Sequence, residues 1–176
     1  MIEYLVLIEQ DLTRELFRDF IRHQEVNLCY RKVETGWVIQ ADPFVDDWSE
    51  EDYQFLIVCL KNTISIHGFV YGAFVEGKLK GFVSVEAEIF DEQQRYCDLS
   101  SLYVSEDMRH QGIGKKLFQS AKNYAQAQGA RKLYISAHSA VESQAFYQAM
   151  GCVEATVSVN KHVEAEPFDC QLECLV

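Results

Sequence analysis

Two glycines and two basic side chains stand together in the stretch "RHQGIG", which runs from Arg109 to Gly114. A β-prone stretch, Leu99–Val104, precedes it and a helical pattern, Lys115–Gln128, follows. The first N–H groups of a helix lack an intrahelical acceptor, and the helix dipole is positive there, so a helix start can bind an anion. Glycines at 112 and 114 allow close approach to the backbone. The stretch therefore predicts a phosphate-binding loop, with an ordinary glycine-containing helix start as the alternative.

The glycine spacing excludes two common phosphate-binding motifs. A P-loop needs a glycine at the position of Arg109, and Ser or Thr at the position of Lys116. A dinucleotide-binding fingerprint needs a third glycine where Leu117 stands. The loop therefore belongs to neither class.

The wider segment "LYVSEDMRHQGIGKKLFQSA" resembles the coenzyme-binding segment of the GNAT superfamily of N-acetyltransferases, in its bacterial type. The family signature is Arg or Gln, two residues, Gly, one residue, then Gly or Ala, and Arg109, Gly112 and Gly114 fill it. The family also has "LYV" before the loop and "FYxxxG" on a later helix, where Phe146 and Tyr147 stand here. The expected order of elements matches the family from residue 1 to residue 176.

The resemblance implies acetyl-CoA as co-substrate. No metal is expected, because none of the five histidines pairs with another at ligand spacing. In the family, the strand before the loop splays from its neighbour and its backbone pairs with the pantetheine arm. The pyrophosphate rests on backbone N–H groups of the loop. Many members also carry Asn seven residues before the tyrosine. Here that position is Ala140, so Ser139 or Ser143 is expected to substitute. The predicted coenzyme-binding residues are Leu102, Tyr103, Val104, Arg109, His110, Gln111, Gly112, Ile113, Gly114, Lys115, Ser139 and Ser143.

The resemblance further implies direct attack of a primary amine, of a small molecule or peptide, on the thioester. An amine with a pKa of about 10.4 costs roughly 4–5 kcal/mol to deprotonate at pH 7, so a base or a water relay would help. Asp98 is the first candidate, because many members carry Glu there and it lies four residues before Leu102, on the same expected strand face. Glu86, Glu88 or water are the other choices. Tyr147 resembles the family's usual acid, placed to donate a proton to the departing sulfur.

Two alternatives to amine acetylation stay open. One is a module that senses acyl-CoA or binds a partner without turnover. The other is transfer of a longer acyl group or transfer to a different acceptor. Tyr147 at the acid position favours an enzyme over a pure binding module.

Composition limits the partners. A net charge of −11 disfavours binding to nucleic acid. Two acidic clusters, Asp46–Asp52 and Glu86–Glu92, predict either a solvated face or a cleft that attracts a cationic small molecule. No apolar run approaches the roughly 18 residues that would span a bilayer, and six scattered cysteines favour free thiols. We therefore expect a cytoplasmic protein that acts on a small amine, with no membrane or nucleic-acid partner; a homodimer is left open.

The spacing of apolar residues predicts a single α/β domain over residues 1–176, with a mixed, mostly antiparallel sheet and about four helices. Thr13 and Ser49 are expected to cap helices. "GWVIQ" at 36–40 is ambiguous. A strand is predicted over 2–8, and a hairpin over 67–90 that turns at Glu76–Lys78. Further strands are predicted over 96–104, 132–136, 152–159 and 168–175, and further helices over 115–128 and 142–151.

Overall fold

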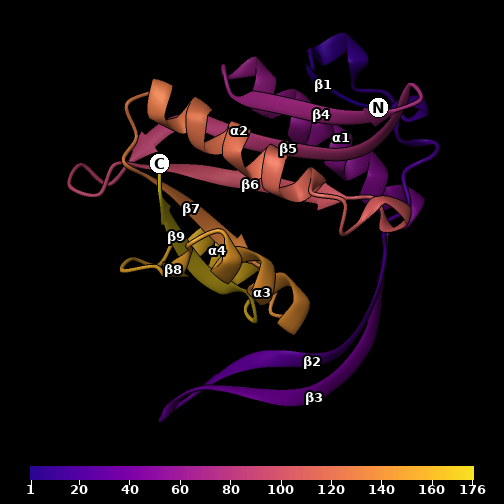
Figure 1. Ribbon diagram of the computed structural model, residues 1–176. Coiled ribbons are helices and arrows are strands. Elements are labelled where there is room, and N and C mark those ends of the chain that lie inside the picture. Colours follow the sequence, from indigo (N-terminus) through magenta and orange to yellow (C-terminus); the bar gives the residue numbers. More distant parts are fainter.

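A seven-stranded sheet forms the centre of the computed structural model, which describes residues 1–176 (Figure 1). Its strand order is β1-β4-β5-β6-β7-β9-β8, and all neighbours are antiparallel except β6 and β7. This confirms the predicted mixed, mostly antiparallel fold. The strands are β1 (Ile2–Val6), β4 (Phe69–Val75), β5 (Lys78–Phe90), β6 (Tyr96–Val104), β7 (Lys132–Ala137), β8 (Val153–Glu154) and β9 (Cys170–Leu175).

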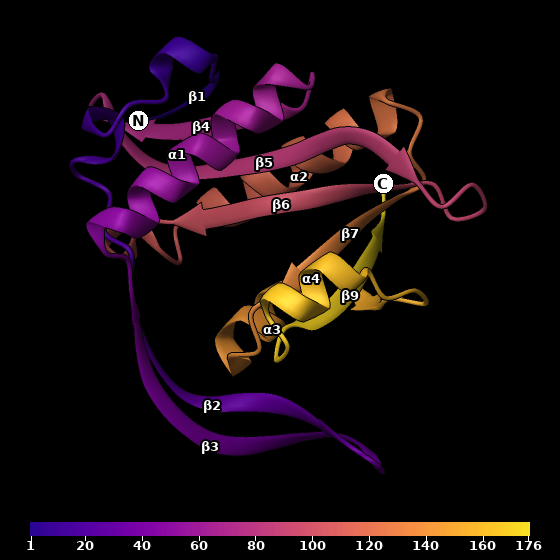
Figure 2. The same ribbon diagram turned by 180° about the vertical axis from the view of Figure 1, so that it is seen from behind.

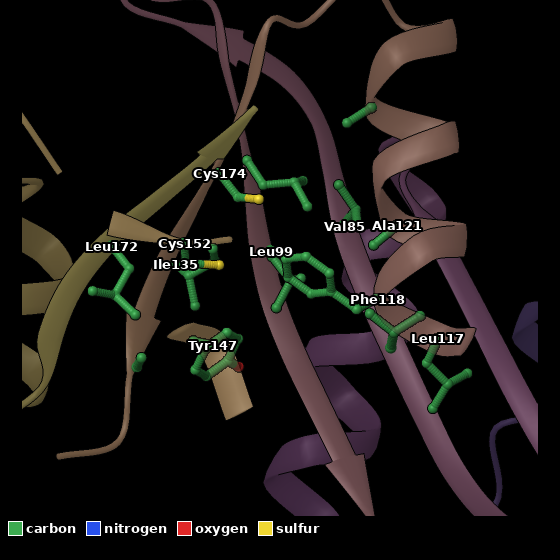
Figure 3. Packing of buried hydrophobic residues seen from close by; sticks show 14 of the residues in the cluster. Val85, Leu99, Leu117, Phe118, Ala121, Ile135, Tyr147, Cys152, Leu172 and Cys174 are labelled. Atoms are coloured by element: carbon green, nitrogen blue, oxygen red, sulfur yellow. The ribbon is translucent and has the colours of Figure 1, made fainter. Parts of the chain in front are cut away.

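Four helices pack against the sheet, and the two long ones cover opposite faces (Figures 1 and 2). They are α1 (Glu50–Ser65), α2 (Ile113–Ala127), α3 (Val141–Ala149) and α4 (Asn160–Ala165). Leu117 and Phe118 of α2 belong to one core, whereas Leu60 of α1 belongs to a second. Figure 3 shows the first core, with Phe118 and Tyr147 on either side of Leu99. None of the helices is long and apolar enough to cross a bilayer.

The central strands β6 and β7 separate after a short parallel contact. Pairing covers only Tyr96–Asp98 against Lys132–Tyr134. Beyond Asp98, β6 stays paired with β5 on one side and has no strand partner on the other. The sheet therefore opens along the second half of β6, which agrees with the predicted splayed strand.

A β-bulge in β6 changes which face its side chains occupy. Val85 pairs with Leu99 and Ser84 pairs with Ser101, which leaves Ser100 as the extra residue. As a result, Leu99 and Leu102 both pack toward the α2 core although they lie three residues apart. The expectation that Asp98 and Leu102 share a face is wrong, because the inserted residue reverses the alternation between them.

Strands β2 (His23–Val33) and β3 (Gly36–Asp47) form a separate two-stranded sheet, which we call the β2–β3 arm (Figure 2). Its middle is attached to the core where the N–H of Tyr30 donates to the carbonyl of Ser139, at 2.8 Å. Near its tip, Lys32 and Trp37 both contact Glu154, at 2.6 and 3.2 Å. The ambiguous "GWVIQ" segment is part of this arm.

Local signals predicted some element ends and failed at others. Ser49 and Asp52 form the expected capping box of α1. The helix expected after Thr13 is wrong: the segment forms a single 3-10 turn, Glu15–Phe17, with both Phe17 and Phe20 packed on Phe82. The strand expected over 152–159 shrinks to β8, because the chain turns into α4 instead.

Candidate active site

A cavity of about 1260 Å³ lies between the β2–β3 arm and the opening of the sheet. One end is lined by the start of α2 and by α3, and the other by the arm and the segment 166–169. The free half of β6 runs between the two ends, represented by Leu102, Tyr103 and Val104. The opening in the sheet therefore joins a glycine-rich end to a charged end.

The predicted phosphate loop forms the glycine-rich end. Gly112 is left-handed, with φ of 81°, and it precedes the first turn of α2. The backbone N–H groups from His110 to Lys115 donate to no other group of the chain. A side chain at Gly114 would meet the ring of Phe146, since a Cβ there lies 3.2 Å from Cε2. The loop thus offers a run of free donors and little side-chain bulk, which fits a diphosphate.

Arg109 lines the cavity, but its guanidinium is not free. Nη2 donates to the carbonyl of His23 at 2.6 Å, and Nε lies 3.4 Å from the carbonyl of Val104. Burial lowers the pKa of Arg109. These contacts connect the end of β6 to the start of the arm, so Arg109 holds the loop and the arm together.

Tyr147 of α3 is buried in the α2 core and also lines the cavity (Figure 3). Its ring packs against Phe118 and Phe146, with centroids 6.1 and 5.1 Å away. Its hydroxyl has no hydrogen-bond partner in the chain, and burial raises its pKa. The side chain therefore packs in the core and presents a protonated hydroxyl to the cavity.

The two serines predicted to replace the family's asparagine differ in their surroundings. Ser139 is buried, and its hydroxyl accepts a hydrogen bond from Arg31 of the arm at 2.7 Å. Ser143 lines the cavity without such a partner. Of the two, Ser143 is the one with a hydroxyl available to a ligand.

The structure brings none of the three carboxylates considered as the base into the cavity. Asp98 is buried under α4, where Oδ2 lies 2.7 Å from Nε2 of His162. Glu86 accepts a hydrogen bond from Thr63 at 2.7 Å, and Glu88 is exposed. The prediction of Asp98 as base is therefore not supported, since the bulge at Ser100 turns its side chain toward α4.

Other carboxylates line the charged end, and two are paired with arginines. Asp42 contacts Arg31, and Asp46 contacts Arg22. The side chain of Arg22 is 6% exposed, and its guanidinium lies over the rings of Trp48 and Tyr103, at 5.6 and 5.3 Å. Asp46 begins one of the two acidic clusters identified in the sequence, whereas no sequence pattern identified its partner Arg22 as a site residue.

Asp169 is the functional candidate that the sequence missed. It lies just before β9, and its Oδ2 accepts a hydrogen bond from Ser136 of β7 at 3.1 Å. Burial, and then the nearby charge of Glu166, raise the pKa of Asp169 to about 6, although the Ser136 hydrogen bond opposes this. The segment "EPFDCQLE" matches no familiar pattern, so only the fold shows that this carboxylate faces the cavity.

His138 also lines the cavity, with one ring nitrogen in a hydrogen bond. Nδ1 accepts a hydrogen bond from the N–H of Ala140 at 3.0 Å, and Nε2 lies 3.8 Å from Asp46. Burial lowers the pKa of His138, which favours the neutral ring. The neutral tautomer then carries its proton on Nε2, toward Asp46.

The opening between β6 and β7, the free N–H groups at the start of α2 and the Tyr147 hydroxyl together are typical of an acetyltransferase. Residues 33–152 match the sequence model of the acetyltransferase (GNAT) family, and the chain belongs to this family. No curated protein sequence matches the chain.

Solved structures share the fold over nearly the whole chain at low sequence identity. Nourseothricin acetyltransferase is 14% identical with a TM-score of 0.70, covering 99% of this chain and 98% of its own. A Bacillus anthracis protein described as a streptothricin acetyltransferase, in complex with acetyl coenzyme A, is 14% identical with a TM-score of 0.72, covering 98% and 96%. The PaiA N-acetyltransferase from Thermoplasma acidophilum, in complex with coenzyme A, is 17% identical with a TM-score of 0.62, covering 100% and 99%.

Proposed function

We propose that the protein transfers the acetyl group of acetyl-CoA to a primary amine of a small molecule by direct attack on the thioester. The observation that carries the proposal is the meeting, in one cavity, of the free N–H groups at the start of α2 and the Tyr147 hydroxyl. The unpaired half of β6 runs between them. A diphosphate, an amide-containing arm and a thioester would find complementary groups in that order along the cavity.

The chemistry follows from these positions. Free backbone groups of β6 would pair with the pantetheine arm, and a backbone N–H there would stabilise the tetrahedral oxyanion. When the C–S bond breaks, the thiolate needs a proton. The Tyr147 hydroxyl is protonated and unpartnered, so it would donate its proton to sulfur and regain one from the new amide nitrogen.

We further propose that the acceptor is a cation. The acceptor end is lined by carboxylates from the β2–β3 arm and from the segment before β9, namely Glu25, Asp42, Asp46, Glu166 and Asp169. The whole chain carries 27 acidic and 16 basic residues. An ammonium group is the natural ligand of such a wall, and the structurally similar proteins named for nourseothricin and streptothricin are consistent with a small acceptor.

An acetyl-CoA thiol-release screen tests the proposed function. The panel contains polyamines, aminoglycosides, amino acids and peptide N-termini, with acetyl-CoA binding measured separately by calorimetry. Turnover is expected with at least one small polyamine or aminoglycoside. Tight acetyl-CoA binding without turnover would instead identify an acyl-CoA-binding module. Turnover only with longer acyl-CoA donors would identify a different acyl transfer.

A further inference from the structure

One cavity carboxylate differs from the others in having neither an arginine partner nor full exposure. Asp42 and Asp46 are each held by a guanidinium. The exposed carboxylates on the cavity wall are Glu25, Glu142 and Glu166. Asp169 is partly buried and forms no ion pair with Lys, Arg or His. Its charge is therefore available to a ligand and is poorly screened by water.

A chain of hydrogen bonds fixes the Asp169 carboxylate. The Tyr134 hydroxyl donates to Oε1 of Gln171 at 2.5 Å, and Nε2 of Gln171 donates to the hydroxyl of Ser136 at 3.0 Å. That hydroxyl in turn donates to Oδ2 of Asp169 at 3.1 Å. Each donor in this series points toward Asp169, and the series ends on Oδ2 of its carboxylate. The other oxygen, Oδ1, has no partner in the chain.

The carboxylate lies beside the reacting groups. Asp169 lines the same cavity as Tyr147 of α3 and Tyr103 of β6. Burial is the main cause of the raised pKa of each tyrosine, and the charge of Asp169 adds a smaller contribution. Ser136, its hydrogen-bond donor, stands on β7 across the opening from β6. Asp169 therefore faces the region between the free half of β6 and the proposed acid.

The other titratable side chain of this region has no free lone pair for the same task. His138 uses Nδ1 to accept from the N–H of Ala140, and its remaining proton lies on Nε2. A base needs an unoccupied lone pair within reach of the substrate proton. Among the partly buried groups at the acceptor end, Asp169 meets this requirement.

We propose that Asp169 is the general base of the reaction, and that Oδ1 binds the acceptor ammonium and takes one of its protons. This inference rests on the proposed N-acetyl transfer. The neutral amine then attacks the thioester carbon, the C–N bond forms, and the C–S bond breaks. The ammonium loses two protons in all. One passes through Asp169 to solvent, and the other reaches the coenzyme sulfur by way of Tyr147.

The pH dependence follows from the groups around Asp169. Burial and the charge of Glu166 raise its pKa to about 6, while Ser136 and His162 act in the opposite direction; Tyr103 and Tyr147 face it as neutral phenols. The base must be ionised to accept a proton. Activity should therefore be present above pH 6 and should be lost as the pH falls through about 6.

The test compares Asp169→Asn with Glu166→Gln, a charge-removing change at an exposed site three residues away in the same segment. With an amine found in the screen, Asp169→Asn is expected to lower kcat/KM by about 10²–10⁴-fold. It should also abolish the acidic limb of the pH profile, which is the fall of kcat/KM at low pH. Glu166→Gln should keep the limb and shift it to lower pH, because a neighbouring negative charge is removed. Acetyl-CoA affinity, measured by calorimetry, should be unchanged in both variants and serves as the folding check.

Three results would overturn the proposal. A wild-type kcat/KM with no limb between about pH 5 and 7 contradicts it without any variant. An Asp169→Asn protein that binds acetyl-CoA and keeps the wild-type limb contradicts it as well, and leaves N-acetyl transfer intact. Wild-type protein that acetylates no amine overturns the proposed function and this inference with it.

Discussion

At the residue scale, Tyr147 combines a packing role with a free hydroxyl, and the two can be separated by one substitution. Tyr147→Phe keeps the ring between Phe118 and Phe146 and removes a hydroxyl that has no partner in the chain. We expect kcat to fall by about 10²-fold or more. Acetyl-CoA affinity and the melting temperature should stay close to wild type. Steady-state kinetics and calorimetry measure this, and wild-type kcat in the Phe variant would leave Tyr147 as a core residue alone.

At Gly112, the effect of a substitution on backbone strain can be separated from its effect on acetyl-CoA binding. Gly112→Val forces a β-branched residue into a left-handed conformation and adds bulk beside the free N–H groups. Gly77→Val is the matched control, since Gly77 has a similar φ of 73° and open space around it, but lies in the β4–β5 turn. Both variants should lose about 1–2 kcal/mol of unfolding free energy. Only Gly112→Val should weaken acetyl-CoA binding, by at least about 10-fold.

Arg109→Ala contrasts with both glycine variants. Its guanidinium donates to carbonyls of His23 and Val104, so its removal should lower the melting temperature more than it lowers acetyl-CoA affinity. Calorimetric affinities that fall further for Arg109→Ala than for Gly112→Val would contradict a coenzyme site built mainly from backbone.

At the scale of elements, the pair Asp98–His162 holds α4 against β6. Asp98 is buried, and its Oδ2 meets Nε2 of His162 at 2.7 Å and Nζ of Lys161 at 3.5 Å. Helix α4 leads directly into the segment that carries Asp169. We therefore expect Asp98 to be a positioning residue that acts on the cavity through α4.

Asp98→Ala should therefore cost about 1–3 kcal/mol of unfolding free energy and raise the acceptor KM, with acetyl-CoA affinity unchanged. Glu86→Gln is the control, because Glu86 also bonds across elements, to Thr63 of α1, yet lies outside the cavity. In a double-mutant cycle the effects of Asp98→Ala and His162→Ala should not add. Additive effects, or a KM that rises equally in Glu86→Gln, would remove the positioning role.

Elements with strong local signals were predictable from the sequence, and those fixed by distant contacts were not. The hairpin turn at Glu76–Gly77, the capping box at Ser49 and the strand from Tyr96 to Val104 agree with the structure. The β2–β3 arm was missed, because its strands mix exposed apolar and polar residues without clean alternation. Helix α4 was missed because it spans only 160–165.

The candidate site likewise has one end that the sequence predicts and one end that it does not. The coenzyme end depends on a contiguous loop, which local sequence can predict. The acceptor end combines the arm, the β7–α3 loop and the segment before β9. A single extra residue in β6, Ser100, turned Asp98 away from its expected face. No pattern in the sequence marks that bulge or brings Asp169 to the cavity.

At the scale of the whole molecule, the excess of 27 acidic over 16 basic residues should act on the encounter with substrate. A cationic acceptor is attracted by this field, and salt screens it, since the Debye length shrinks from about 10 Å at 0.1 M to about 3 Å at 1 M. We expect kcat/KM for the acceptor to fall as ionic strength rises. An uncharged amine analogue is the control. A flat or rising curve for the cation would leave the charge as a solubility feature.

The two attachments of the β2–β3 arm have a further consequence for what can reach the thioester. The arm is tied to the core at Ser139 by Tyr30, and again at Glu154 by Lys32 and Trp37. The arm thus crosses the proposed acceptor side of the cavity and is attached to the core at both places. A lysine in the middle of a folded polypeptide would have to thread its own backbone beneath that span, whereas a free amine or a chain end passes under it directly. We therefore expect free amines and chain ends to be better acceptors than lysines inside a folded polypeptide.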